Sequence, residues 1–116
     1  MSKDILYLIK APFIDGDNGP YYCPGCAEML GLLAIYPELQ NVLEVRYVEF
    51  ARPRPELVQR LGEENQSCPV LVLGDTDISK LSGDLKVQKA GTEFFVEGPR
   101  EIGEYLAACH GIGIPH

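Results

Sequence analysis

Cys23-Pro24-Gly25-Cys26 lies between an unbroken apolar run at residues 4–10 and a helical pattern that extends to Tyr36. Two thiols at this spacing are a candidate redox pair or half of a metal site. An unbroken apolar run of this length is typical of a strand that is covered on both faces. If Cys23 lies at the start of the helix, the helix dipole and the free N–H groups favour a thiolate. The stretch therefore predicts a junction between strand and helix that carries reactive sulfur.

Length and charge narrow the class of protein. The chain has 116 residues, of which 46% are hydrophobic and 23% charged, so we expect one globular domain over residues 1–116. The net charge is −7, and the ten basic residues are scattered, which argues against nucleic acid as a partner. No apolar stretch approaches the ~20 residues that a membrane span requires, so we expect no membrane partner.

The cysteine count and the N-terminus bear on the compartment. The apolar run at residues 4–10 is shorter than that of a secretory signal, so we expect a cytoplasmic protein. In a reducing cytosol, four cysteines with a Cys-x-x-Cys pair indicate redox or metal chemistry rather than a disulfide scaffold.

Further elements follow from apolar periodicity and from Pro and Gly signals. We expect an edge or half-exposed strand at 43–50, a short helix that begins near Pro55 and stops at Gly62, and strands at 68–73 and 92–96. Residues 11–22 read as a polar loop and 76–91 as an extended connection. The expected inner face of the first helix comprises Ala27, Leu30, Leu33 and Ala34, and that of a last helix after Gly98-Pro99 comprises Ile102, Tyr105, Leu106 and Cys109.

These elements give the order βαβαββα and an α/β fold with a four-stranded mixed sheet flanked by helices. The first two strands should be parallel, with a right-handed crossover, and the last two should pair as a hairpin.

This order, with Cys-x-x-Cys at the first helix and Pro69 opening the third strand, resembles the thioredoxin-like superfamily over nearly the whole chain. The motif Cys23-Pro24-Gly25-Cys26 is similar to that of glutaredoxins. The segments 54–56, 68–71 and 97–106 resemble the N-terminal domain of glutathione transferases. The chain also resembles an uncharacterised family of small bacterial thioredoxin-like proteins.

The resemblance implies a thiol–disulfide oxidoreductase without a bound cofactor, in which Cys23 is the nucleophile and Cys26 the resolving thiol. It implies that Pro69 follows a cis peptide bond and that the backbone of Cys68 docks an extended thiol or disulfide substrate, either a protein or a small molecule. Glu97 matches the acidic residue that holds glutathione in relatives, so glutathione is a candidate co-substrate. Tyr22, just before the motif, is a candidate for lining the substrate groove.

The residues also allow other roles for Cys68 and another function for the chain. Cys68 could be a third redox thiol, a packed small side chain, or a metal ligand with Cys23 and Cys26. The chain could also be a non-catalytic module of the same fold that docks a partner protein or forms a homodimer. The motivation is that strand 4–10 offers no obvious buried acid beside the motif, since Asp4 lies at its start.

Overall fold

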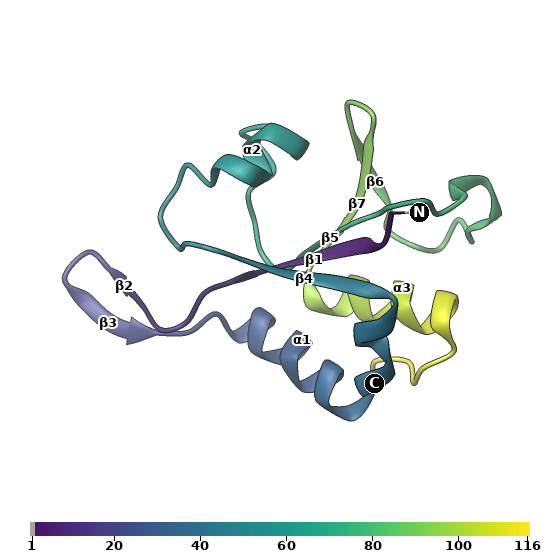
Figure 1. Ribbon diagram of the computed structural model, residues 1–116, viewed down its shortest axis with the longest axis horizontal. Coiled ribbons are helices and arrows are strands. Elements are labelled where there is room, and N and C mark those ends of the chain that lie inside the picture. Colours follow the sequence, from purple (N-terminus) through teal and green to yellow (C-terminus); the bar gives the residue numbers. More distant parts are fainter. Residues whose placement is uncertain (1) are drawn as a thin grey trace.

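A mixed sheet of five strands forms the centre of the protein, and helices pack on both of its faces (Figure 1). The computed structural model describes residues 2–116. In spatial order the strands are β4 (Leu43–Val48), β1 (Asp4–Ile9), β5 (Val70–Val72), β7 (Glu93–Glu97) and β6 (Gln88–Ala90). The helices are α1 (Pro24–Ile35), α2 (Pro55–Leu61) and α3 (Pro99–His110), with short 3-10 helices η1 (Pro37–Asn41) and η2 (Ile78–Lys80). The α/β class is as expected.

The pairing of the strands follows the predicted order. β1 and β4 are parallel, in register from Asp4 opposite Leu43 to Ile9 opposite Val48, and β4 is an edge strand. β5 pairs antiparallel with β1, and β7 pairs antiparallel with β5. Helices α1 and α3 cover one face of the sheet and α2 covers the other (Figure 1).

The prediction of four strands is wrong, because the sheet has a fifth strand, β6, within the segment read as an extended connection. The segment read as a polar loop also holds a separate two-stranded sheet, β2 (Phe13–Asp15) and β3 (Asn18–Tyr21). These strands are three or four residues long and mostly exposed, so no apolar alternation marks them. Backbone pairing with a neighbour defines them instead.

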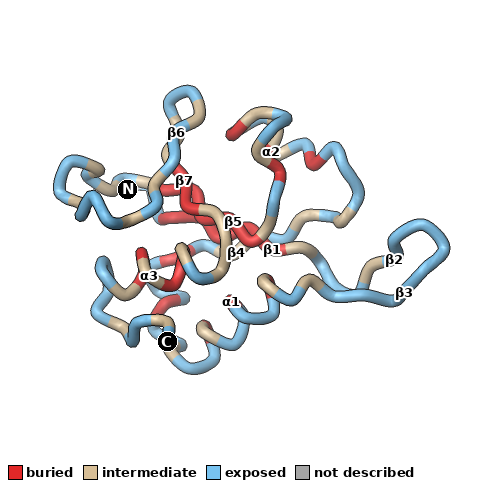
Figure 2. Tube along the Cα trace, turned by 180° about the vertical axis from the view of Figure 1, so that it is seen from behind, coloured by how far each residue is buried: buried red, intermediate tan, exposed pale blue. Residues whose placement is uncertain are grey.

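The β2–β3 hairpin projects from the rest of the protein (Figures 1 and 2). Gly16 has a φ of 64° at its turn, a conformation that glycine adopts without steric cost. The ring of Phe13 stacks on that of Phe50, with centroids 4.3 Å apart. This contact attaches the hairpin to the loop that follows β4.

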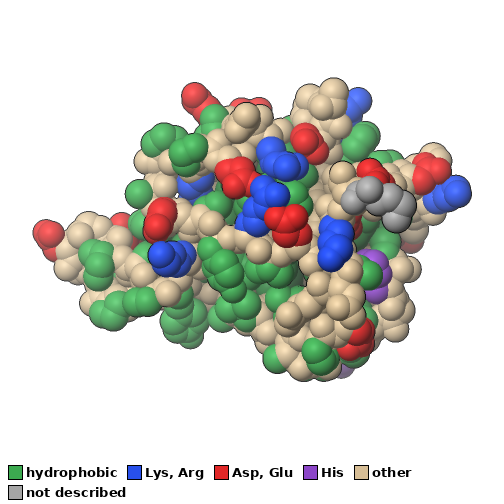
Figure 3. Space-filling model, in the orientation of Figure 1, with side chains coloured by type: hydrophobic (Ala, Val, Ile, Leu, Met, Phe, Trp, Pro, Cys, Tyr) green, Lys and Arg blue, Asp and Glu red, His purple; other side chains and the backbone are tan. Residues whose placement is uncertain are grey.

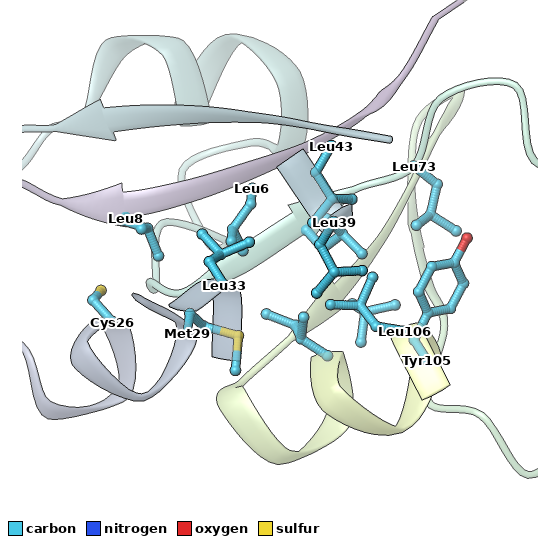
Figure 4. Close-up of a cluster of buried hydrophobic side chains, with 13 residues drawn as sticks. Leu6, Leu8, Cys26, Met29, Leu33, Leu39, Leu43, Leu73, Tyr105 and Leu106 are labelled. Carbon is cyan, nitrogen blue, oxygen red and sulfur yellow. The ribbon is translucent and has the colours of Figure 1, made fainter. Parts of the chain in front are cut away.

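Two apolar cores lie on the two faces of the sheet, and Figure 4 shows side chains of the larger one. The larger one joins β1, β5 and β7 to α1 and α3, and the smaller one packs Leu57 and Leu61 of α2 on Tyr7. The inner face of α1 is Cys26, Met29 and Leu33, so the expected face is right only at Leu33. Ala27, Leu30 and Ala34 are exposed. The helix is apolar on almost every side, so its periodicity does not fix which side is buried.

Within residues 2–116, no helix has both the length and the apolar character needed to cross a membrane.

Candidate functional site

Cys23 occupies the N-cap of α1, where its backbone is extended, with φ −80° and ψ 116°. Its Sγ accepts a hydrogen bond from the backbone N–H of Cys26 at 3.2 Å, as cap side chains do at a helix start. Pro24 then takes the first helical position, where its missing N–H costs nothing. Cys23 is half-buried. The local sequence thus fixes a partly accessible sulfur at the positive end of the helix dipole.

Cys26 faces the core and is only 3% exposed. Its Sγ accepts a hydrogen bond from the N–H of Ile9 at 3.3 Å, at the carboxyl end of β1. Burial, and secondarily the neighbouring Cys23 thiol, raises the pKa of Cys26 to about 12. Figure 4 shows Cys26 at one end of the apolar cluster, close to Leu8. Cys26 is therefore a protonated thiol in the reduced protein, shielded from solvent.

The segment Cys68–Pro69, just before β5, contacts the Cys23–Cys26 motif. The peptide bond between Cys68 and Pro69 is cis, and the Cys23 thiol donates to the Cys68 carbonyl oxygen at 3.9 Å. Pro69 lies against Gly25, since a Cβ on this glycine would stand 3.0 Å from the Pro69 Cδ. The N–H of Gly98 donates to the Pro69 carbonyl oxygen at 3.1 Å. The starts of α1, β5 and α3 therefore converge around Cys23.

Cys68 is half-buried, and burial raises the pKa of its thiol to about 11. The Arg54 guanidinium is the strongest influence in the opposite direction, and Arg52 acts the same way. Sequence reasoning missed Arg54, which is only 4% exposed. Its only sequence signal is its place between two prolines at a helix start.

Backbone carbonyl groups hold the Arg54 side chain. Its Nε and Nη2 donate to the Phe50 carbonyl oxygen at 3.2 and 2.7 Å, and its Nη1 donates to the carbonyl oxygen of Gln66. Its backbone N–H donates to the Gln66 side chain at 2.7 Å. These bonds tie the loop after β4 to the segment that leads into Cys68.

The other predicted residues take different places. Glu97 is half-buried at the end of β7, opposite Val70 and next to the Gly98 N–H that reaches Pro69. Tyr22 is 64% exposed and directly precedes Cys23. Asp4 is buried at the opposite end of β1 from the thiols, where it accepts from the Gly74 N–H and the Tyr105 hydroxyl.

The expectation that Cys109 packs in the core is wrong, because its side chain is exposed near the end of α3. Its helical phase matches the apolar face, but α3 extends past the edge of the core at this point. Cys109 lies outside the thiol cluster and serves as a natural control for it.

The four thiols are free, and residues 2–116 contain no group of three or more His, Cys, Asp or Glu side chains arranged to hold a metal ion. Cys23, Cys26 and Cys68 thus do not form a ligand set in this arrangement, although they lie close to one another.

The fold and the site together define a small α/β protein with three thiols where strand and helix ends meet. Residues 3–114 match the family described as "Protein of unknown function (DUF3088)". The match covers nearly the whole chain, and the protein belongs to this family. No curated protein and no solved structure matches it.

Proposed function

We propose that the protein is a thiol–disulfide oxidoreductase of thioredoxin or glutaredoxin type, built on a thioredoxin-like fold. The observation that carries the proposal is the position of Cys23. Its sulfur caps α1, accepts the Cys26 N–H at 3.2 Å and remains partly accessible. The N-terminus of a helix favours negative charge, and the thiolate is the form of cysteine that attacks disulfides.

In the proposed reaction, the Cys23 thiolate attacks one sulfur of a substrate disulfide and expels the other as a thiolate. This leaves a mixed disulfide on Cys23. The Cys26 thiol, three residues further along the chain, then loses its proton, attacks the Cys23 sulfur and releases the second substrate thiol. Burial of Cys26 among apolar side chains keeps it protonated until this step.

The Cys68–Pro69 segment supports a docking role. The Cys68 carbonyl oxygen lies 3.9 Å from the Cys23 sulfur, and Pro69 packs directly on the motif at Gly25. A substrate held along the Cys68 backbone would have its sulfur beside Cys23. Glu97, two residues before α3, is the proposed acidic contact for glutathione as a co-substrate.

The test is the reduction of a protein disulfide and of a glutathione mixed disulfide with dithiothreitol as electron donor. We expect Cys23→Ser to fall to the uncatalysed rate. The matched control is Cys109→Ser, which removes an exposed thiol outside the site and should retain wild-type turnover. Equal activity of wild type and Cys23→Ser would eliminate the proposal.

A second candidate, a module that docks a partner without turnover, is favoured by the exposed apolar side chains beside the motif. Ile14, Tyr21 and Tyr22 are 58%, 46% and 64% exposed, and apolar side chains gather at the projecting hairpin (Figure 3). Such a surface suits a protein contact, including a second copy of this chain. An inactive wild-type protein that still binds a partner through this hairpin would support this candidate.

A further inference from the structure

Cys68 and Cys26 are two buried or half-buried thiols beside Cys23, and their surroundings differ. We propose that Cys68 is a second resolving thiol, which attacks a mixed disulfide on Cys23 and closes a Cys23–Cys68 disulfide. This inference rests on the proposed function and adds a third redox residue to it.

The first support is position. The Cys23 Sγ is 3.9 Å from the Cys68 carbonyl oxygen. The Cα of Cys68 is two bonds from that oxygen, so it lies within roughly 6 Å of the Cys23 sulfur. The contact of Pro69 with Gly25 and the bond from Gly98 to Pro69 hold this segment against the motif. The Cys68 backbone thus lies beside the Cys23 sulfur, and the proposal requires that side-chain rotation bring the two sulfurs together.

The second support is charge. The charged groups that act most strongly on Cys68 are Arg54, Cys23 and Arg52, and no carboxylate is among them. A resolving thiol must carry negative charge as it attacks, and two guanidinium groups stabilise that charge. At Cys26, the strongest influence in this direction is the N–H of Ile9. Burial raises the pKa of Cys68 to about 11, less than the value of about 12 at Cys26.

The third support is the state of Arg54. Among residues 2–116 this buried guanidinium forms no ion pair with a carboxylate. Three of its bonds go to backbone carbonyl oxygens, and its positive charge acts on the neighbouring Cys68 thiol in the direction that favours a thiolate. A buried cation without an anion is costly. A thiolate at Cys68 supplies negative charge beside Arg54, so the two charges stabilise each other while Cys68 attacks.

A disulfide R–S–S–R reacts with the Cys23 thiolate, which leaves R–S on Cys23 and releases one R–S⁻. The Cys68 thiol loses its proton and attacks the Cys23 sulfur, the sulfur–sulfur bond between Cys23 and the R–S group breaks, and the proton passes to the leaving R–S⁻. The protein loses two hydrogens, and the disulfide is reduced to two thiols.

The experiment uses the full chain with Cys26→Ser and Cys109→Ser, which leaves Cys23 and Cys68 as its thiols. Serine retains an acceptor for the Ile9 N–H, and Cys26→Ala provides a second version if serine impairs folding. The reduced variant is treated with one equivalent of 5,5′-dithiobis(2-nitrobenzoate), an aromatic disulfide that releases a coloured thiolate. Colour and intact mass are then followed.

We expect two coloured thiolates per chain and a protein lighter by two hydrogens, with peptides that link Cys23 to Cys68. The comparison variant, which also carries Cys68→Ser, should release one thiolate and retain the aromatic adduct on Cys23. A retained adduct in the variant that keeps Cys68 would overturn the inference. That result leaves the proposed function standing, because the loss of reductase activity in Cys23→Ser tests it separately.

Discussion

Tyr7 is wholly buried in β1, yet its hydroxyl group contacts a charged side chain, that of Glu56. The hydroxyl donates to the Glu56 carboxylate, which also accepts from Arg46. Burial first, and then the bond to Glu56, raises the pKa of Tyr7 to about 12. Ionisation of Tyr7 would place a second negative charge beside Glu56 inside the protein, so the folded state holds the neutral phenol.

This shift predicts how stability depends on alkaline pH. The folded pKa is raised from 10.0 to about 12, so the contribution of Tyr7 is fully present below pH 10.0 and is lost as pH rises through about 12. We expect the part due to Tyr7 to be roughly 2 kcal/mol of the free energy of unfolding. Urea titrations across this range should show a smaller alkaline loss for Tyr7→Phe than for wild type. Tyr47→Phe, at an exposed tyrosine, is the control, and an undiminished loss in Tyr7→Phe would contradict this account.

At Gly74 the structure leaves no space for a side chain. A Cβ there would lie 2.3 Å from the Ser2 carbonyl oxygen and 2.7 Å from that of Lys3, both backbone atoms. We expect Gly74→Ala to reduce the free energy of unfolding by about 1–3 kcal/mol, since the chain must shift. A Cβ at Gly83 would have no heavy atom within 4 Å other than those of the glycine and its two chain neighbours, so Gly83→Ala is the matched control. Denaturant unfolding of the two variants tests this, and equal midpoints would refute it.

At the scale of elements, α1 carries both the site and a large part of the core. Its N-terminus presents Cys23, while Met29 and Leu33 pack in the larger core (Figure 4). The position of the Cys23 sulfur therefore depends on packing several residues away from it.

The buried face of α1 yields a direct comparison of two leucines. Leu33 is 6% exposed and Leu30 is 43% exposed. We expect Leu33→Ala to cost about 2–5 kcal/mol, because it leaves a cavity in the core. Leu30→Ala should change stability by about 0.5 kcal/mol or less. Thermal unfolding measures both, and a larger loss at Leu30 would place the helix in the other phase.

The elements that could be predicted from sequence are those whose side chains are buried periodically. β1, β4, α2 and α3 each show such a pattern, and their pairing or packing agrees with it. β2, β3 and β6 are short and exposed, so only their partners define them. The helix α1 was predictable, but its buried face was not, because the helix itself carries apolar side chains on almost every side.

The candidate site divides in the same way. The spacing within Cys23-Pro24-Gly25-Cys26 is evident from the sequence, whereas the position of Cys68 and Pro69 beside it was implied by the resemblance to the thioredoxin-like superfamily. Arg54 was not predictable, since its burial depends on carbonyl groups of Phe50 and Gln66 that only the tertiary structure brings together.

At the scale of the whole molecule, the sheet order brings the starts of α1, β5 and α3 to one end, and the β2–β3 hairpin extends beyond it (Figure 1). The chain leaves this hairpin at Tyr21 and reaches Cys23 two residues later. A protein substrate that reaches the sulfur would therefore also contact the hairpin, whereas a small disulfide would not.

This arrangement predicts that the hairpin matters for large substrates only. We expect Ile14→Ala, in β2, to raise KM several-fold for a protein disulfide and to leave KM for a small disulfide unchanged, because an exposed apolar contact is lost. The control is Ile114→Ala, which removes an exposed side chain near the C-terminus. An equal change in KM for both substrates would count against docking on the hairpin.

The central claim is that Cys23 is an activated nucleophile, and competitive alkylation tests it most directly. Native, reduced protein is treated with limiting iodoacetamide near neutral pH, and peptide masses give the rate at each cysteine. Cys109 is more exposed than Cys23, but partial burial raises the pKa of its thiol. The account predicts that Cys23 is modified roughly tenfold faster than Cys109, because a cysteine at a helix N-terminus is more reactive. Faster modification of Cys109 would contradict it.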